Sequence, residues 1–294
     1  MSIDLVENAP AKINLSLRVL GRRADGYHDI ESLVVFADVC DRLTLALGGA
    51  LTLTVSGPSA AQTGADADNL VIKAARALAA RVANLRAGAF GLEKSIPVAA
   101  GLGGGSADAA AALRLLARAN KIAPDDPRLH DAARATGADV PVCLDPQPRL
   151  MRGIGDIISA PLPLPRLYAV LVNPGVAVPT KLVFAGWTPA ANSARDRAAA
   201  ADFAATAKMQ DERQLIDWLA CQANDLEAPA IALAPTIADV LASLRGSAGC
   251  CLARMSGSGA TCFALFASAA QTAAAGKNLR AQFPGWWISE TVLG

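Results

Sequence analysis

The sequence has few of the residues that build metal clusters and disulfide frameworks. It contains two histidines, His28 and His130, and its six cysteines include no C-x-x-C pair. This scarcity argues against a zinc site with Cys and His at finger-like spacing. Because nothing indicates secretion, we expect the six cysteines to be free thiols.

Charge is also scarce. Charged residues make up 18% of the chain and the net charge is +1, so there is no general attraction to nucleic acid or to a membrane surface. The N-terminal segment MSIDLVENAP carries acids and lacks an apolar stretch, which argues against a signal peptide. The uncharged window 255–276 contains Gly, Ser and Thr, which favours loop, strand and helix over a membrane span. We therefore expect no nucleic-acid partner and no membrane partner.

What the chain does contain is enough apolar sequence for a large core. It has 294 residues, 53% of them hydrophobic, which predicts one large domain or two ordinary ones. Residues 12–20 alternate apolar and polar side chains, as a half-buried strand does, whereas 68–83 and 106–120 have the apolar spacing of helices, with Asp68 or Asn69 as the first cap. Single helices are also expected over 229–249 and from about residue 190. The pattern predicts an α+β protein with helices packed on a sheet in each half, and the proline-rich segment 160–167 predicts a crossover between domains 1–160 and 161–294.

The stretch GLGGGSADAAAAL, from Gly101 to Leu113, joins a glycine-rich loop to an alanine-rich helix. It does not match the Walker A pattern, because no lysine follows the glycines, and it does not match G-x-G-x-x-G, because Ser106 occupies the sixth position. Glycines nevertheless let the backbone approach a ligand, and the free N–H groups at a helix start attract anions. The stretch therefore predicts a polyphosphate site, with a tight turn that serves only packing as the alternative. Asp108 would repel phosphate, but an acid in the first turn suits the helix dipole. We therefore expect it to stabilise the helix, with a metal-facing position as the alternative.

Three further segments belong with this loop. Lys12 opens the first strand, Asp139 lies between Gly137 and Pro141 in TGADVPVCL, and MSGSGATCF is a second glycine turn that leads into an apolar strand. Alone, a lysine is usually a solvated charge and an aspartate before Val-Pro is usually a turn former. Their joint occurrence is much more specific.

The segments PAKINLSLRV, RADGYHDIESL, IPVAAGLGGGSADAAAAL, TGADVPVCL, NPGVAVPT and MSGSGATCF have the order and approximate spacing of one superfamily. The chain resembles the GHMP kinases from about residue 9 to residue 266. The resemblance implies an ATP-dependent small-molecule kinase of two domains, each a mixed or antiparallel sheet covered by helices, with the active site in the cleft between them. Within the superfamily, R-x-D-G-Y-H separates the chain from homoserine, mevalonate and galactose kinases.

That branch implies a substrate, 4-diphosphocytidyl-2-C-methyl-D-erythritol, phosphorylated on its C2 hydroxyl in the non-mevalonate route to isoprenoid precursors. It implies ATP, and Mg²⁺ bound mainly through the nucleotide phosphates with no protein ligands assigned. It further implies a bacterial cytoplasmic enzyme that is a monomer or a weak homodimer.

The resemblance also assigns residues. Asp139 corresponds to the catalytic base and Lys12 to its charged partner beside the acceptor hydroxyl. The ATP phosphate loop corresponds to Pro97, Val98, Ala99, Ala100, Gly101, Leu102, Gly103, Gly104, Gly105, Ser106 and Ala107. The diphosphocytidyl substrate would contact Asn14, Tyr27, His28, Thr180 and Phe184, with Tyr27 and Phe184 on the two sides of the cytosine.

Two places depart from the superfamily pattern: Asp156 stands where glutamate is usual, and 188–215 has no clear match. The alternatives are a GHMP kinase of the homoserine or mevalonate type, a nucleotide-binding regulator without catalysis, and an RNA-associated βα module. The near-zero net charge and the lack of interleaved basic and aromatic residues argue against the last of these.

Overall fold

The computed structural model describes residues 5–63, 68–189, 209 and 211–294. Internal contacts divide the chain into two compact units, which we call unit 1 (Met1–Lys12, Val39–Val98 and Gly103–Pro146) and unit 2 (Ile13–Asp38, Ala99–Leu102 and Gln147–Gly294). The units alternate along the chain. The expected domains 1–160 and 161–294 are two continuous stretches of the chain. The contacts do not test whether each stretch is a domain, so that division stays a prediction.

The sheet of unit 1 is mixed. Strand β3 (Thr52–Ser56) pairs in parallel with β4 (Gly88–Glu93), which pairs antiparallel with residues 42–47 of β2 (His28–Leu47). Strands β1 (Leu5–Arg22) and β2 contribute residues to both units. The sequence contains two apolar runs, at 31–39 and 41–47, and both lie in the single strand β2, with Asp41 buried in its interior.

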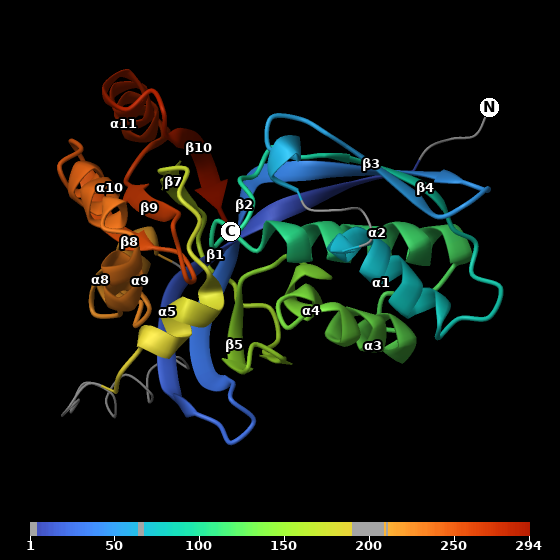
Figure 1. The fold of residues 1–294 in the computed structure, drawn as a ribbon. Helices are drawn as coiled ribbons and strands as arrows, with labels where there is room; N and C mark the ends of the chain where they lie inside the picture. Colours follow the sequence, from blue (N-terminus) through green and yellow to red (C-terminus); the bar gives the residue numbers. More distant parts are fainter. Residues whose placement is uncertain (1–4, 64–67, 190–208, 210) are drawn as a thin grey trace. The chain divides into compact units, whose positions relative to one another are not determined.

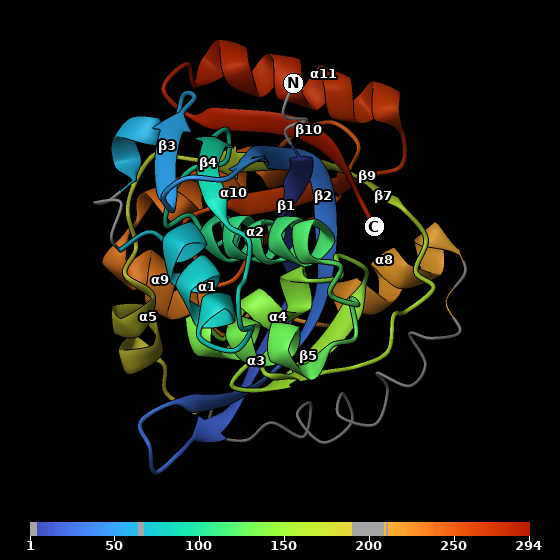
Figure 2. The same ribbon diagram turned by 90° about the vertical axis from the view of Figure 1, so that its right-hand side faces the viewer.

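The helices of unit 1 lie on one face of this sheet (Figures 1 and 2). They are α1 (Leu70–Ala79), α2 (Gly104–Asn120), α3 (Pro127–Thr136) and the short α4 (Val140–Cys143), and a 3₁₀ turn spans Ala60–Gln62. The expected cap of α1 is Asn69, whose side chain accepts the Val71 N–H at 3.0 Å. Asp126 caps α3 in the same way.

Helix α2 is buried on almost every side, because it lies between the sheet and the other helices (Figure 1). Its small alanine side chains allow this close packing. The predicted helix over 106–120 is confirmed, and it begins two residues earlier, at Gly104, because Gly103 adopts a left-handed conformation with φ 61° and ends the loop.

Unit 2 is built on an antiparallel sheet in the order β10 (Trp287–Leu293), β7 (Leu167–Asn173), β9 (Cys262–Phe266) and β8 (Cys250–Met255). A second group pairs β5 (Arg149–Gly153) with residues 30–34 of β2 and with β6 (Ile157–Ile158). Asp156 accepts the N–H of Ile154 at 3.1 Å in the turn before β6. The α+β class and the mixed and antiparallel sheets are therefore as predicted.

The described helices of unit 2 are α5 (Thr180–Gly186), α8 (Glu212–Ala220), α9 (Glu227–Leu233), α10 (Thr236–Arg245) and α11 (Ala269–Gln282). The prediction of one helix over 229–249 is wrong: Pro235, which cannot continue a helix, separates α9 from α10. The helix expected from about residue 190 lies outside the described residues over 190–208, and so does most of 188–215.

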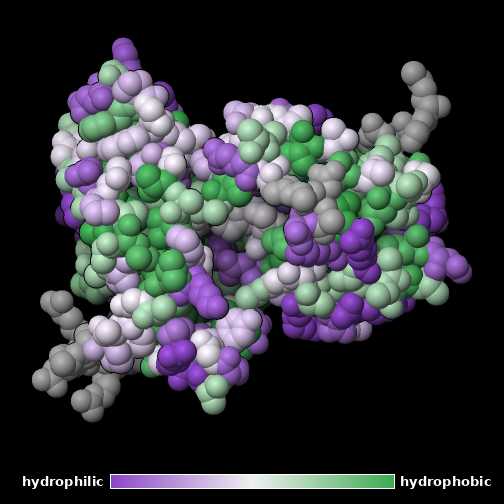
Figure 3. Space-filling model, viewed as in Figure 1, coloured by the Kyte–Doolittle hydropathy of each residue, from purple (hydrophilic) through white to green (hydrophobic). Residues whose placement is uncertain are grey.

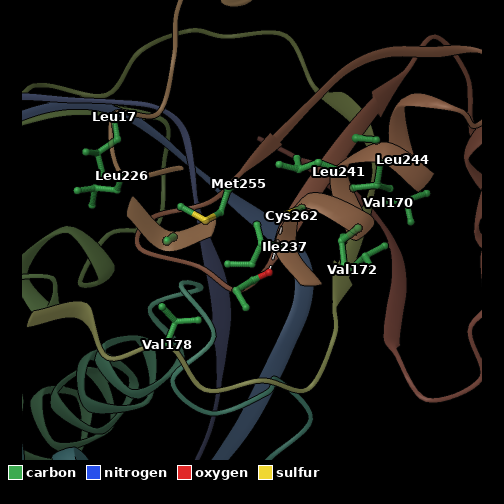
Figure 4. Packing of buried hydrophobic residues seen from close by; sticks show 14 of the residues in the cluster. Leu17, Val170, Val172, Val178, Leu226, Ile237, Leu241, Leu244, Met255 and Cys262 are labelled. Carbon is green, nitrogen blue, oxygen red and sulfur yellow. Dashed lines mark hydrogen bonds between the residues drawn. The ribbon is translucent and has the colours of Figure 1, made fainter. Parts of the chain in front are cut away.

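The core of unit 2 forms between α10, α9 and the strands. Figure 4 shows Ile237, Leu241 and Leu244 of α10 beside Val170 and Val172 of β7, all at most 1% exposed. On the surface of unit 1, hydrophilic residues gather over α3 (Figure 3), where Arg128, Asp131 and Arg134 are exposed. All six cysteines are free thiols, as predicted. In the described part of the chain, no helix combines the length and apolarity needed to cross a bilayer.

Candidate active site

Lys12 and Asp139 meet in unit 1 although 127 positions separate them. The Lys12 Nζ atom donates a hydrogen bond to Asp139 Oδ2 at 2.8 Å. The lysine side chain is 5% exposed and the aspartate side chain 38% exposed. Asp139 is the residue before the short helix α4, which has Pro141 in its first turn. The pair thus combines a buried cation with a carboxylate that solvent and a ligand can reach.

The start of α2 lies directly beside this lysine. A Cβ atom at Gly103 would be 3.2 Å from both Cβ and Cε of Lys12, so a larger residue there would press on the lysine stem. The N–H groups of Gly104, Gly105 and Ser106 have no i−4 carbonyl inside the helix, and Gly103, the residue before the helix, has no side chain that could cap them. A positive helix end without a cap, beside a lysine, is chemically suited to a polyphosphate.

The predicted phosphate loop passes from one unit to the other and back. Pro97, Val98 and Gly103–Ala107 belong to unit 1, and Ala99–Leu102 belong to unit 2. In unit 1, the Val98 N–H is bonded to Gln62 Oε1 at 3.2 Å. Ala99 has a positive φ of 52° although it is not glycine, an uncommon backbone state that often marks functional loops.

Within unit 2, the second glycine turn holds the loop residue Gly101. The Ser256 hydroxyl donates to the Gly101 carbonyl at 3.0 Å and accepts the Asn14 N–H at 3.1 Å. A Cβ at Gly101 would lie 2.4 Å from the Ser256 carbonyl oxygen, and φ there is +75°. Ser256 was missed by the sequence reasoning, although MSGSGATCF was recognised as a motif, because nothing local shows which serine reaches back to the loop.

A second lysine with aspartate partners lies under the start of α2. Lys94 Nζ donates to Asp108 Oδ2 at 2.7 Å and also to Asp41 Oδ2. Asp41 Oδ1 accepts the N–H groups of Ser95 and Ile96 at 2.6 and 2.8 Å. The three charged side chains are at most 4% exposed. Asp108 therefore faces a lysine, whereas the sequence suggested helix stabilisation or a metal.

Burial raises the pKa of Asp108 to about 7, and the nearby Asp41 charge adds to the increase while Lys94 opposes it. Burial alone would lower the pKa of Lys94, but the two carboxylates raise it overall. Sequence reasoning missed Lys94 and Asp41. The sequence did offer one signal: Asp41 lies inside an apolar strand, and Lys94 directly follows another. Charged residues are rarely buried in such places unless they are paired.

Aromatic rings cluster among the predicted substrate residues of unit 2. The rings of His28 and Phe184 stack with centroids 5.0 Å apart and an interplanar angle of 27°, and Trp187 meets His28 edge-on at 5.9 Å. Burial lowers the pKa of His28, and the Arg22 charge lowers it further, so its ring is neutral near pH 7. Tyr27 is 60% exposed and lies in the turn after β1, where its N–H is bonded to Asp25. Trp187 was not predicted.

Two predicted polar contacts are engaged with the protein itself. Thr180 Oγ1 is 2.8 Å from the hydroxyl of Ser258, in the second glycine turn. Asn14 is 3% exposed, and its Nδ2 donates to the Ser32 hydroxyl at 2.7 Å. The roles of these residues toward a substrate stay predictions.

Two family models match the chain. Residues 69–145 match the GHMP kinase N-terminal domain and residues 198–285 match the GHMP kinase C-terminal domain. The chain is therefore similar to kinases of that superfamily over both of its halves.

Full-length relatives are more specific. The chain is 56% identical over 299 residues to the 4-diphosphocytidyl-2-C-methyl-D-erythritol kinase of Rhodopseudomonas palustris strain BisB18, which covers 100% of the chain and 97% of the relative. It is 56% identical to the enzyme of that name from Methylobacterium radiotolerans, over 98% of the chain and 99% of the relative.

Solved structures give the same answer. A crystal structure of 4-(cytidine 5'-diphospho)-2C-methyl-D-erythritol kinase matches with a TM-score of 0.74 and 32% identity over 99% of both chains. Homoserine kinase from Cytophaga hutchinsonii matches with a TM-score of 0.75, at 21% identity over 100% of this chain and 95% of that one, which shows a shared fold only. The chain belongs to the GHMP kinase superfamily and, within it, to the 4-diphosphocytidyl-2-C-methyl-D-erythritol kinase family.

Proposed function

We propose that this protein transfers the γ-phosphoryl group of ATP to the C2 hydroxyl of 4-diphosphocytidyl-2-C-methyl-D-erythritol. One observation carries the proposal: the buried Lys12 ammonium is bonded at 2.8 Å to a carboxylate of Asp139 that remains 38% exposed, beside the uncapped start of α2. The relatives at 56% identity support the choice of substrate.

Phosphoryl transfer requires alignment and charge stabilisation more than covalent help from the protein. In this proposal Asp139 accepts the proton of the acceptor hydroxyl, a role that typically contributes about 10²–10⁴-fold to the rate. Lys12 holds the Asp139 carboxylate in place and balances charge on the transferred group. The N–H groups at the start of α2 bind the phosphates. The acceptor is a hindered tertiary alcohol, so we expect positioning to dominate.

Bound ATP and Mg²⁺ would supply the phosphoryl group and neutralise its negative charge. The residues present suit the nucleotide, because the Lys12 side chain packs against Gly103 beside the free N–H groups at the start of α2. We propose that Mg²⁺ is held mainly by phosphate oxygens and water. The bacterial cytoplasmic location and the monomer or weak dimer expected from the sequence stay predictions.

The cytidine part of the substrate would provide remote binding energy for the reaction. We assign it to the aromatic group of His28 and Phe184 with Tyr27, and to the polar side chains of Asn14 and Thr180. Stacking of a base on an aromatic ring is worth about 1–3 kcal/mol by alanine substitution. The Phe184→Ala variant should therefore raise KM for the cytidine substrate by about tenfold with little effect on KM for ATP.

An ATP-coupled assay tests the proposal directly. The purified chain is given 4-diphosphocytidyl-2-C-methyl-D-erythritol, homoserine or mevalonate, and ADP release is followed together with the phosphorylated product. We expect turnover with the first substrate alone. Turnover with homoserine or mevalonate instead would replace the proposed substrate. ATP binding without turnover on any of the three would indicate a regulator.

The Phe184→Ala prediction needs a matched control from the same unit. Phe283 stacks on Trp286 with centroids 3.8 Å apart and has no proposed contact with substrate. The Phe283→Ala variant should leave both KM values unchanged. An unchanged KM for the cytidine substrate in Phe184→Ala would contradict the assignment of this ring.

A further inference from the structure

Two lysines approach consecutive glycines at the start of α2, and only one of them has a part in the proposed chemistry. Lys12 approaches Gly103, as described above. Lys94 approaches the next residue: a Cβ at Gly104 would lie 3.1 Å from Lys94 Nζ and 3.3 Å from Cγ2 of Ile96. The ammonium group of Lys94 thus lies immediately under the first turn of the helix that would bind the phosphates.

The contacts of Lys94 and Asp41 tie the two ends of the loop together inside unit 1. Asp41 accepts two consecutive N–H groups just after β4, from Ser95 and Ile96. Lys94 connects Asp41 to Asp108, which lies one turn inside α2. The chain segments that enter and leave the loop are therefore held in one buried network of charge-assisted hydrogen bonds, which are stronger than neutral ones.

The charge balance of this network is unusual. One ammonium faces two carboxylates, so the cluster would carry a net negative charge if both were ionised, next to a site for an anion. Asp41 accepts three hydrogen bonds through its two oxygens. Among the described residues, Asp108 Oδ1 is buried without a hydrogen-bond partner, which is costly for an ionised carboxylate. Of the two, Asp108 is the carboxyl that is better suited to hold a proton.

No other charge in the described surroundings of Asp108 provides this balance. The buried face of α1 that packs on α2 is apolar, with Val71, Ile72, Ala74, Ala75 and Leu78. From α4, the Cys143 thiol is neutral because burial raises its pKa to about 12. Lys12 and Asp139 neutralise one another, and Arg114 of α2 is paired with Glu7. Lys94 and Asp41 are the ionised groups that act directly on Asp108, and its pKa of about 7 agrees with this arrangement.

We propose that Lys94 and Asp108 are positioning residues for the nucleotide phosphates: Lys94 fixes the first turn of α2 over the end of β4, and Asp108 takes up a proton from solvent when the phosphates bind. The added negative charge above the helix start disfavours the Asp108 carboxylate, so binding and proton uptake are linked. The proposal rests on the proposed function, because it assumes that ATP phosphates bind at this helix end.

The test is isothermal titration calorimetry of MgADP binding to the full chain at pH 7.0, 7.5 and 8.0, in two buffers of different ionisation enthalpy. The difference between buffers counts the protons taken up. We compare the wild type with Asp108→Asn, which keeps the shape of the side chain but cannot be ionised. The matched control is Asp125→Asn, because Asp125 is exposed and lies outside the network.

We expect the wild type and Asp125→Asn to take up a larger fraction of a proton than Asp108→Asn, by up to one proton at the highest pH. Wild-type affinity should weaken by up to about tenfold per pH unit above neutrality, and the Asp108→Asn affinity should show only the dependence due to the nucleotide itself. Equal proton uptake and equal pH profiles in the wild type and Asp108→Asn would overturn the proposal.

Lys94→Gln tests the positioning role separately. The loss of this charge under the helix start should raise the MgADP dissociation constant by about tenfold and raise KM for ATP more than it lowers kcat. A merely structural role would not produce that split, and an unchanged dissociation constant would contradict the role of Lys94. If Lys94→Gln does not fold, as judged by circular dichroism, Lys94→Arg is measured instead. This variant keeps the positive charge, so we expect it to retain affinity for MgADP. A loss of affinity would contradict the role of Lys94.

The outcomes also separate this inference from the proposed function. If the wild type binds no MgADP, the assumption about the nucleotide fails. If the wild type binds MgADP with no proton uptake beyond that of the nucleotide, the site stands and the role of Asp108 fails, whether or not the Asp108→Asn variant folds.

Discussion

Unit 1 contains two lysine–aspartate groups that use the same chemistry in opposite environments. In the first, Lys12 meets one carboxylate, and that carboxylate is 38% exposed. In the second, Lys94 meets two carboxylates that are 0% and 4% exposed. Both lie beside the first glycines of α2. The two groups therefore differ in two ways. The pair suited to catalysis has one carboxylate, which is exposed, whereas the network suited to structural support has two carboxylates, which are both buried.

The largest expected effect comes from the exposed pair. Lys12→Met keeps the apolar stem but removes the charge that faces Asp139, so kcat should fall by about 100-fold or more, and the melting temperature should change little. Steady-state kinetics with the cytidine substrate and a thermal melt measure the two quantities. Lys73→Met is the control, because Lys73 has a side chain 46% exposed on α1. A kcat for Lys12→Met within threefold of Lys73→Met would remove the distinction between the two groups.

The buried network should show the opposite balance. Lys94→Met leaves two carboxylates buried without their cation, a change that typically costs about 3–5 kcal/mol of unfolding free energy. Urea unfolding measures that loss, and the same Lys73→Met control should lose less than about 0.5 kcal/mol. A Lys94→Met protein as stable as the control would mean that the network does not support unit 1.

Gly103, which lies against Lys12, offers a sharper comparison. Gly103→Ala and Gly48→Ala both place a Cβ at positive φ, 61° and 99°, and each should lose about 1–2 kcal/mol of stability. A Cβ at Gly48 meets nothing within 4 Å, whereas one at Gly103 meets Lys12 at 3.2 Å. Only Gly103→Ala should therefore lower kcat. Equal kcat values in the two variants would show that the lysine stem does not depend on this space.

The last prediction concerns pH. The folded state holds a proton on Asp108 up to about pH 7, whereas the unfolded chain releases it near pH 4. Folding is therefore favoured by this group at low pH, and that contribution is lost progressively as the pH rises from 4 to 7. The unfolding free energy of Asp108→Asn should decline less over that range, as measured by urea titrations at several pH values. A parallel decline in both proteins would show that Asp108 does not titrate in this way.

Sequence patterns predicted most of the architecture because the signals are local. Periodicity located the strands and helices, and the glycine run located the start of α2. Pro235 was a local break that the apolar spacing of 229–249 concealed, and Gly103 moved the helix start by its left-handed backbone.

The candidate site was predictable where a motif carried it, as for Lys12 and Asp139. The network of Lys94, Asp41 and Asp108 was not, because its partners come from strand β2, from the residue that follows β4 and from helix α2, and no spacing relates them. The three side chains associate because they are buried together. The burial of a charged residue cannot be recognised from the sequence until the packing is known. The same holds for Ser256, whose hydroxyl bonds to Asn14 and to Gly101, residues 242 and 155 positions away in the sequence.

The proposed mechanism requires Asp139 to accept the proton beside the phosphate-binding end of α2. Rapid-quench measurement of a single turnover, with saturating ATP and 4-diphosphocytidyl-2-C-methyl-D-erythritol, tests it most directly in Asp139→Asn. We expect a chemical step at least about 100-fold slower than in the wild type, with MgADP affinity retained. A chemical step within threefold of the wild-type rate, in a folded Asp139→Asn protein, would contradict it.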